Sequence, residues 1–494
     1  MKLIKKIAAI MFAFMMVVSM SCNVKADEGT TATTEKGEIT IDKAIDGQTY
    51  TIYKLLDLES YDEPNNHYSY RPSTEWKNFF ETTEAKNYIT VDENGYANWV
   101  KGADQAEFAQ KALAYATTNG IGNKGTAKAS NNTVTFKNLD LGYYLVDSSV
   151  GALCLLDTTN PTATIQEKNG VPSVKKTITD GGVLATDYKS NSVNIGDTVT
   201  FQTIIDVKKG AQGYVLHDTL STGLKLISKI NDLTDSPIMA VASGTDESGK
   251  AFNNNLTKDS HYTITYDDHS FTVTILDSYL KTHETVDYHI AISYKAILTD
   301  AAVVGGAGNT NKTYLKYGVS SESAPSTTTT YTFGIPVLKY TGDVSKPLAG
   351  AKFKLYTDSN CNDESTALKF SLNNNKYRYD SKNGKTVLTS LETTGRIDIE
   401  GLEAGTYYLK EIEAPKGYNL LANAVEVQIT QDGKVKVKNG DAYDEVNRVD
   451  VENKTGTVLP STGGAGTTMI YLIGGALVLG SGVVLATKRR VKNK

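Results

Sequence analysis

The sequence predicts an all-β chain built from tandem β-sandwich domains. Short runs rich in Thr, Val, Ile and Tyr alternate between polar and apolar residues, and Gly, Asn and Asp interrupt them. This pattern is typical of half-buried strands joined by turns. The 494 residues leave room for roughly three domains of about 150 residues each. The clearest predicted strands are Ile39–Ile41, Thr198–Val207, Tyr262–Tyr266, Phe271–Leu276, Ala351–Tyr356 and Val425–Ile429.

Domain boundaries are predicted where loop-forming residues gather. Gly170-Val171-Pro172 separates a first domain from a second, and Ser320–Thr330, rich in Ser and Thr, is predicted to be a low-complexity linker to a third. One helix is predicted at Gln105–Thr117, where apolar residues recur at helical spacing. The predicted segments are an N-terminal segment at 1–26, domains at 27–170, 171–330 and 331–455, and a C-terminal region at 456–494.

Both ends of the chain carry targeting signals. Residues 1–26 combine early lysines, an apolar stretch and a small residue at the cleavage position, which predicts a secretory signal peptide. A lipid anchor on Cys22 is the alternative, which the polar Ser19 three residues earlier disfavours. Met469–Thr487 is uncharged for 19 residues and is followed directly by three basic residues. It is therefore predicted to span a membrane with its basic end inside.

The charge of the exported part disfavours nucleic acid as a partner. The whole chain has 51 basic and 56 acidic residues, but four lysines lie in 1–26 and five basic residues lie in 463–494. The remainder therefore has 42 basic and 56 acidic residues, a net charge of −14. Because binding to a phosphate backbone needs clusters of Lys and Arg, no nucleic acid is expected.

A short motif stands just before the predicted span. Leu459-Pro460-Ser461-Thr462-Gly463 resembles the LPxTG sortase signal of Gram-positive surface proteins. Proline keeps this segment bent and extended, so that a sortase cysteine can reach the Thr462 carbonyl. The resemblance implies cleavage between Thr462 and Gly463, which leaves a threonyl acyl-enzyme that an amine resolves.

Longer segments resemble the backbone pilins of Gram-positive bacteria. They are GEITIDKAIDGQTYTIYKLLDL at Gly37–Leu58, GYYLVDSS at Gly142–Ser149, HDTLSTGLKL at His217–Leu226, NKTYLKY at Asn311–Tyr317, PLAGAKFKLY at Pro347–Tyr356 and the E-box-like GTYYLKEIEAPKGY at Gly405–Tyr418. The resemblance implies immunoglobulin-like sandwiches of the collagen-adhesin type. It also implies, as partners, a pilus-type (class C) sortase, a housekeeping sortase, identical subunits, ancillary tip or base pilins and peptidoglycan.

Strand alternation directs three polar side chains of the third domain inward. Lys339, Glu411 and Asn453 each share a strand face with apolar residues, because positions i, i+2 and i+4 lie on one face. A buried ion pair with a hydrogen-bonded amide is one interpretation. The other, which the E-box favours, is an autocatalysed bond between Lys339 and Asn453. Burial disfavours the charged forms of Lys339 and Glu411. The neutral amine of Lys339 would therefore stand beside a protonated Glu411, which acts as the catalytic acid.

The second domain repeats this pattern. Lys176, and not Lys175, shares a face with apolar residues, and Asp218 likewise points inward. The resemblance implies a bond between Lys176 and Asn311 with Asp218 as the acid. Asn309 remains an alternative, since it lies two residues earlier on the same face.

A polymer built by sortase also needs an exposed lysine that accepts the threonyl group. Lys168 lies on the polar face of the first domain's last predicted strand, and Ile165–Asn169 resembles the pilin motif, with Gln166-Glu167 in place of the usual Tyr-Pro. Lys168 is therefore the predicted linking residue and Lys175 is the reserve. In the same domain, Lys43 and Asp147 sit on apolar strand faces, but a solvated edge explains them better, and no internal bond is predicted there.

These features predict a structural protein and not an enzyme. No G-x-S-x-G motif, paired catalytic carboxylates or metal cluster is found, and the six histidines are scattered, so neither a cofactor nor a metal is expected. The predicted function is the backbone subunit of a covalent, cell-wall-anchored pilus. The alternatives are a monomeric wall-anchored adhesin that binds host matrix or glycan, and a secreted hydrolase on a β-sandwich scaffold.

Overall fold

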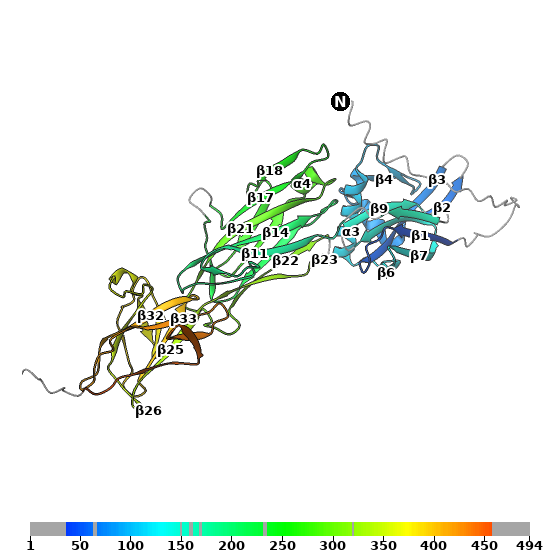
Figure 1. Ribbon diagram of the computed structural model, residues 1–494. Coiled ribbons are helices and arrows are strands. Elements are labelled where there is room, and N and C mark those ends of the chain that lie inside the picture. Colours follow the sequence, from blue (N-terminus) through cyan, green and yellow to red (C-terminus); the bar gives the residue numbers. More distant parts are fainter. Residues whose placement is uncertain are drawn as a thin grey trace, which may run out of the picture. The chain divides into compact units, whose positions relative to one another are not determined.

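The computed structural model consists almost entirely of β-sheets, which confirms the all-β prediction (Figure 1). It divides into two compact units, residues 1–168 and 169–494. The residues it describes are 36–62, 67–148, 151–157, 162–166, 170–230, 235–318 and 321–456.

The first unit pairs a three-stranded sheet with a five-stranded one. The three-stranded sheet contains β10 (Thr162–Gln166), β1 (Lys36–Asp42) and β7 (Thr133–Asp140), with β1 parallel to β10. The antiparallel five-stranded sheet contains β3 (His67–Pro72), β2 (Thr49–Asp62), β8 (Gly142–Ser148), β9 (Gly151–Asp157) and, beside β2, β6 (Gly125–Lys128). A small ribbon, β4 (Ile89–Val91) with β5 (Ala97–Trp99), completes the strands of this unit.

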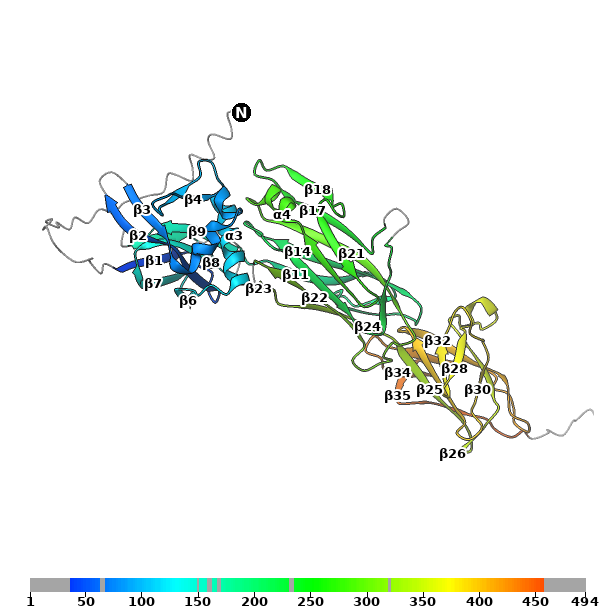
Figure 2. The same ribbon diagram turned by 180° about the vertical axis from the view of Figure 1, so that it is seen from behind.

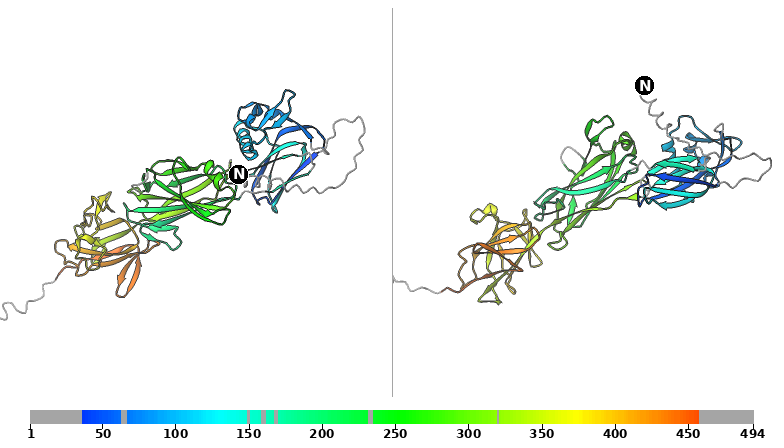
Figure 3. Two further views of the ribbon diagram at one scale, coloured as in Figure 1. Left: turned by 90° about the horizontal axis from the view of Figure 1, so that it is seen from above. Right: turned by 45° about the vertical axis from the view of Figure 1, so that its right-hand side comes forward.

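Helices cover the second face of the five-stranded sheet (Figure 3). They are the 3₁₀ turns η2 (Thr74–Trp76) and η3 (Ala85–Asn87) and the helices α2 (Lys77–Glu81) and α3 (Gln105–Asn119). The predicted helix is thus confirmed and is slightly longer, and Asp104 caps it by accepting a hydrogen bond from the Glu107 amide at 3.0 Å. Trp76, Phe79 and Phe108 are buried between the helices and the sheet. The unit is therefore a sandwich with an added helical layer that strand periodicity alone did not predict.

Two further sandwiches make up the second unit (Figure 2). In the middle domain, one sheet contains β11 (Ser173–Asp180), β14 (Thr198–Val207), β21 (Tyr288–Leu298), β17 (Ile238–Thr245), β18 (Ala251–Asn255) and β16 (Leu224–Leu226). The facing sheet contains β12 (Val183–Leu184), β13 (Ser190–Ser192), β24 (Ser326–Tyr331), β22 (Asn309–Tyr317), β15 (Val215–Leu220), β20 (Ser270–Ile275), β19 (Tyr262–Tyr266) and β23 (Ser321–Glu322). Helix α4 (Asp277–Leu280) and the 3₁₀ turn η4 (Lys281–His283) connect β20 to β21.

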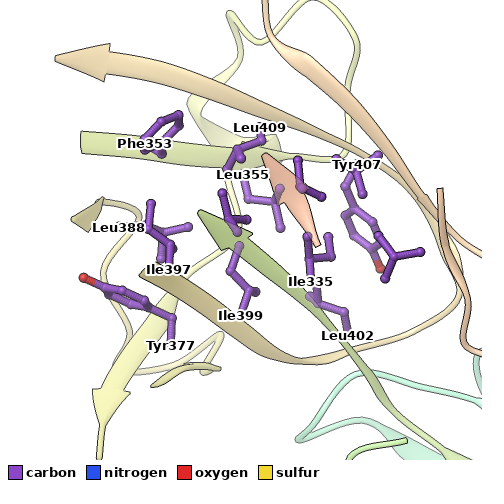
Figure 4. Close-up of a cluster of buried hydrophobic side chains, with 14 of the residues drawn as sticks. Ile335, Phe353, Leu355, Tyr377, Leu388, Ile397, Ile399, Leu402, Tyr407 and Leu409 are labelled. Carbon is purple, nitrogen blue, oxygen red and sulfur yellow. The ribbon is translucent and has the colours of Figure 1, made fainter. Parts of the chain in front are cut away.

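The C-terminal domain is a sandwich of two six-stranded sheets. One contains β26 (Asp343–Pro347), β25 (Phe333–Thr341), β31 (Arg396–Leu402), β29 (Lys376–Tyr379), β28 (Phe370–Asn373) and β36 (Val449–Glu452). The other contains β30 (Leu388–Thr389), β27 (Lys352–Tyr356), β32 (Gly405–Glu413), β33 (Val425–Ile429), β34 (Val435–Asn439) and β35 (Ala442–Val446). A 3₁₀ turn, η5 (Glu364–Thr366), lies between β27 and β28. Figure 4 shows side chains from both sheets, such as Ile335, Leu355 and Leu409, packed into one core.

The prediction of a linker at Ser320–Thr330 is wrong. Most of it forms β23 and β24, and β24 pairs with β22 and with β13 inside the middle sandwich. The low-complexity composition concealed a strand because its inward residues, Thr328 and Thr330, are polar yet fully buried. Threonine is β-branched and fits a strand well, so the segment closes the middle domain.

Hydrogen bonds donated by backbone amides join the middle and C-terminal sandwiches directly. Only Thr332 separates β24 from β25. The Ile195 amide donates to the Gly401 carbonyl at 3.0 Å, and the Glu403 amide donates to Asn194 Oδ1 at 3.1 Å. These bonds connect the loop after β13 to the end of β31 and to the turn between β31 and β32.

Within the described residues no helix is long and apolar enough to span a membrane. The signal peptide, the LPxTG-like motif and the predicted span all lie outside those residues.

Candidate functional site

The middle domain brings three predicted side chains together between its sheets. Lys176 lies on β11 in one sheet, whereas Asp218 on β15 and Asn311 on β22 lie in the other. Strands β15 and β22 pair so that Leu220 stands opposite Asn311, which puts Asp218 diagonally beside the amide on the same face. Lys176 Nζ forms an ion pair with Asp218 Oδ2, and all three side chains are fully buried.

Tyr294 is a fourth member of this site that the sequence did not reveal. It lies on β21 in the sheet of Lys176, and its hydroxyl is 2.9 Å from each carboxyl oxygen of Asp218. Asn311 Nδ2 donates to the same hydroxyl at 2.8 Å, and Lys176 Nζ donates to it as well. Alternation along β21 does put Tyr294 on the inward face, but a buried tyrosine there is indistinguishable from an ordinary core aromatic.

Burial sets the charge states in this site. Desolvation lowers the pKa of Lys176 and raises the pKa of Asp218, although the attraction between the two groups opposes both shifts. The pKa of the Tyr294 hydroxyl is raised well above its ordinary value, chiefly by burial. A neutral amine beside a neutral acid is therefore the arrangement that desolvation favours.

Asn309 and Asn311 differ sharply in their surroundings. Asn309 Oδ1 accepts from the Val303 amide at 2.9 Å, and its Nδ2 donates to the Val303 and Thr330 carbonyls at 3.1 and 3.2 Å. Its amide thus has backbone partners away from the lysine. Asn311, in contrast, contacts the Tyr294 hydroxyl, and its Oδ1 is buried without a hydrogen-bond partner.

The C-terminal domain holds the second set of buried side chains. Lys339 lies on β25, Glu411 lies on β32 of the facing sheet, and Asn453 follows β36, which runs parallel to β25. Lys339 Nζ is 3.7 Å from Glu411 Oε1 and donates to the Val451 carbonyl at 3.0 Å. Asn453 Nδ2 donates to Glu411 Oε2 at 3.1 Å. The carboxyl therefore lies against both the amine and the amide nitrogen.

Two oxygens in this second site have no partner. Glu411 Oε1 and Asn453 Oδ1 are both buried without a hydrogen bond. A buried acceptor without a donor is costly. The Leu421 amide already donates to Oε2 at 3.0 Å. The acceptors that lack a donor are thus Glu411 Oε1, which faces the Lys339 amine, and Asn453 Oδ1.

Two family models match the chain. Residues 334–442 match the SpaA family, described as a prealbumin-like fold domain, and residues 451–494 match the LPXTG cell wall anchor motif. The chain is a cell-wall-anchored surface protein with the fold of Gram-positive pilins. Such an anchor implies export, a sortase and attachment to peptidoglycan. No curated protein matches its sequence.

Solved pilin structures are similar to this wall-anchored protein. The three-domain T6 backbone pilin of Streptococcus pyogenes is 17% identical, with 81% of each chain covered and a TM-score of 0.50. The full-length major pilin SpaD of Corynebacterium diphtheriae is 19% identical over 86% of this chain and 99% of its own, with a TM-score of 0.49. The pilus 2b backbone protein of group B streptococcus is 24% identical over 58% and 99%, with a TM-score of 0.42.

Among the described residues of the first domain, no comparable set of a buried lysine, acid and asparagine occurs. Lys43 is exposed, in agreement with a solvated position. Asp147 differs from that expectation, because it is half-buried on β8 and desolvation raises its pKa to about 7. Its position on the middle strand pair of the sheet, opposite Thr51, explains this burial.

The residues predicted to link subunits are only partly described. Lys168, Leu459, Pro460, Ser461, Thr462 and Gly463 lie outside the described residues. Lys175, the reserve lysine, is exposed on β11 and points away from the buried Lys176.

The lowered pKa of Lys339 gives the anchored protein a measurable pH dependence. Desolvation lowers this pKa to about 8. In an Asn453→Ala variant, which keeps Lys339 beside Glu411, the C-terminal domain is expected to become more stable as the pH rises from 8 to 10. In that window the unfolded lysine retains a proton that the folded lysine has lost, so the free energy of unfolding rises, by on the order of 2 kcal/mol.

Denaturant titrations at the two pH values measure this effect. The matched control is the double variant Lys339→Met/Asn453→Ala, which lacks the titrating amine but keeps every other ionisable group. Parallel pH profiles for the single and double variants would contradict the assignment of a lowered pKa to Lys339.

Proposed function

We propose that this protein is the backbone subunit of a covalently polymerised pilus. In this proposal a pilus-type sortase joins Thr462 of one subunit to Lys168 of the next, and a housekeeping sortase finally transfers the polymer to peptidoglycan. Ancillary pilins occupy the tip or base of the fibre. The subunit serves as a mechanical shaft and has no substrate of its own to turn over.

The observation that carries this proposal is the repetition of one chemical arrangement in two successive domains. Each contains a buried lysine, a buried acid and a buried asparagine in contact across the sandwich core. An ion pair without further chemistry is a poor way to stabilise a core, because desolvation of two charges offsets most of their attraction. A shaft that transmits tension, in contrast, benefits from a covalent bond in every domain.

The chemistry proposed for the C-terminal domain uses Glu411 twice. The neutral amine of Lys339 attacks Asn453 Cγ while the protonated carboxyl stabilises the oxygen that becomes negative. The carboxyl then takes a proton from the new ammonium group and gives one to Nδ2. The Cγ–Nδ2 bond breaks, ammonia leaves, and an amide bond joins Lys339 to Asn453.

The two proposed bonds would reinforce different interfaces. The Lys339–Asn453 bond would join β25 to the end of the neighbouring parallel strand β36, in one sheet. The Lys176–Asn311 bond would join β11 to β22, which lie in opposite sheets. The first would protect a strand pair from being peeled apart, and the second would prevent the middle sandwich from opening.

An immunoblot of cell-wall extracts boiled in detergent tests the polymer directly. A ladder of high-mass species is expected, because only covalent links between subunits survive this treatment. A single band at the mass of one subunit would contradict the pilus proposal. It would favour the monomeric wall-anchored adhesin instead.

A further inference from the structure

The hydroxyl group of Tyr294 occupies a central position in the middle-domain site. It contacts Lys176 Nζ, both oxygens of Asp218 and Asn311 Nδ2. In the reaction proposed above, these are the nucleophile, the acid and the leaving nitrogen. The ring is fully buried against Phe201 and Phe271, with centroid distances of 5.5 and 4.7 Å, so the hydroxyl is held in place.

Among the described residues, the C-terminal site contains no such hydroxyl, and its acid is longer. There, Glu411 itself contacts Asn453 Nδ2, at 3.1 Å. In the middle domain, no hydrogen bond joins Asp218 to Asn311 among the described side chains, and aspartate is one methylene shorter than glutamate. The aromatic ring that faces Lys339 Nζ, with its centroid 6.0 Å away, belongs to Phe353, which has no hydroxyl. The Tyr294 hydroxyl therefore bridges the shorter acid, Asp218, and the amide nitrogen of Asn311.

We propose that Tyr294 is a catalytic residue of the middle domain, whose hydroxyl relays a proton from Asp218 to the departing nitrogen of Asn311. This inference rests on the proposed Lys176–Asn311 bond and adds a residue to its mechanism. The C-terminal domain needs no relay because its carboxyl reaches the leaving nitrogen directly.

The proposed relay balances every proton. The Nζ–Cγ bond forms between the neutral Lys176 amine and Asn311, beside the protonated Asp218. In the tetrahedral intermediate Nδ2 is an amine with a free lone pair, so it can accept a proton from the Tyr294 hydroxyl. Tyr294 regains a proton from Asp218, and Asp218 then takes one proton from the new ammonium group at Lys176. The Cγ–Nδ2 bond breaks, and ammonia leaves. The acid and the tyrosine end in the states in which they began.

The test is the rate of bond formation in a Tyr294→Phe chain. Full-length chains are pulse-labelled during synthesis, sampled over time in denaturant and digested, and the Lys176–Asn311 cross-linked peptide is quantified by mass spectrometry. Loss of a proton relay is expected to slow this bond by about 100-fold or more. The Lys339–Asn453 peptide from the same chains is expected to form at the wild-type rate.

Two further variants distinguish a chemical role of the Tyr294 hydroxyl from a packing role of its ring. Tyr288→Phe, on the same face of β21, removes a buried hydroxyl without a hydrogen-bond partner, so it is expected to leave both rates unchanged. A ring-fluorinated tyrosine at position 294 keeps the hydroxyl and its contacts but makes it more acidic. It is expected to change the rate of the middle-domain bond and its pH profile.

Each outcome distinguishes the relay from the underlying reaction. If wild-type chains never yield the Lys176–Asn311 peptide, both the bond and its relay are wrong. If they yield it and Tyr294→Phe forms it at the wild-type rate, only the relay is wrong. A slow Tyr294→Phe chain whose fluorinated counterpart matches wild type would also overturn the relay, because it would leave Tyr294 a packing role alone.

Discussion

Glu411→Gln is expected to abolish the covalent bond in the C-terminal domain. Glutamine has the shape of glutamate and an oxygen that can still accept from the Leu421 amide and from Asn453, so the fold is retained. It carries no proton that can be shuttled, and the attack of Lys339 on Asn453 therefore stops. The variant retains the ammonia that the wild-type chain loses when the bond forms. After correction for the Glu-to-Gln mass difference, it is therefore expected to be heavier than the wild-type chain by one ammonia.

The same variant should lose much of the stability of that domain. The bond closes a loop on the order of 100 residues, and a cross-link of this length restricts the unfolded chain by about 4–5 kcal/mol in the chain-entropy description used for disulfides. Peptide mapping and denaturant unfolding of the full chain measure both effects. The matched control is Glu413→Gln on the same strand, whose exposed carboxylate pairs with Lys352 at 2.7 Å. Its loss should cost at most about 1 kcal/mol.

The middle domain provides an internal reference for this experiment. Its Lys176–Asn311 peptide is expected at the wild-type level in both variants, since Asp218 is unchanged. A Lys339–Asn453 peptide at the wild-type level in Glu411→Gln would show that the carboxyl is not needed.

Lys168→Arg is expected to convert the polymer into single wall-anchored subunits. Arginine preserves the charge, but its delocalised guanidinium is always protonated and is a poor nucleophile toward a threonyl acyl-enzyme. Anchoring through Thr462 does not use this lysine. An immunoblot of wall extracts should therefore lose its ladder and retain one band.

Lys175→Arg is the matched control for that strain. It alters Lys175, which is exposed on β11 and lies seven residues further along the chain, and it should leave the ladder intact. A ladder that persists in Lys168→Arg and disappears in Lys175→Arg would assign the link to Lys175. A ladder in both strains would contradict both candidates.

Strand periodicity predicted that the six site residues face inward, and all six are buried, but it did not distinguish Asn311 from Asn309, which lies on the same face and is also buried. Alternation on β11 correctly separates the exposed Lys175 from the buried Lys176, and the predicted strand Thr198–Val207 is reproduced residue for residue as β14. Such predictions succeed because a strand that is buried on one face repeats every two residues. An ionisable residue on the inward face then stands out against its apolar neighbours.

Three features could not be predicted in this way, each for a physical reason. Tyr294 is both aromatic and polar, so its position in the core needs no explanation until its hydroxyl is seen among the reacting groups. The inward residues of β24, Thr328 and Thr330, are buried but polar, so the sequence of this strand shows no alternation of apolar and polar residues and resembles a linker. The part of the first unit's helical layer that precedes α3 depends on Trp76 in η2 and Phe79 in α2, and these segments of three and five residues are too short to show a periodic pattern.

Peptide mapping of native fibres is the most direct test of a covalent shaft built from internally cross-linked subunits. Digests are expected to contain three branched peptides, joining Lys176 to Asn311, Lys339 to Asn453, and Thr462 of one subunit to Lys168 of the next. Each internal bond should appear with the loss of one ammonia. Fibres that yield these segments only as separate linear peptides, with both asparagines intact, would contradict the proposal.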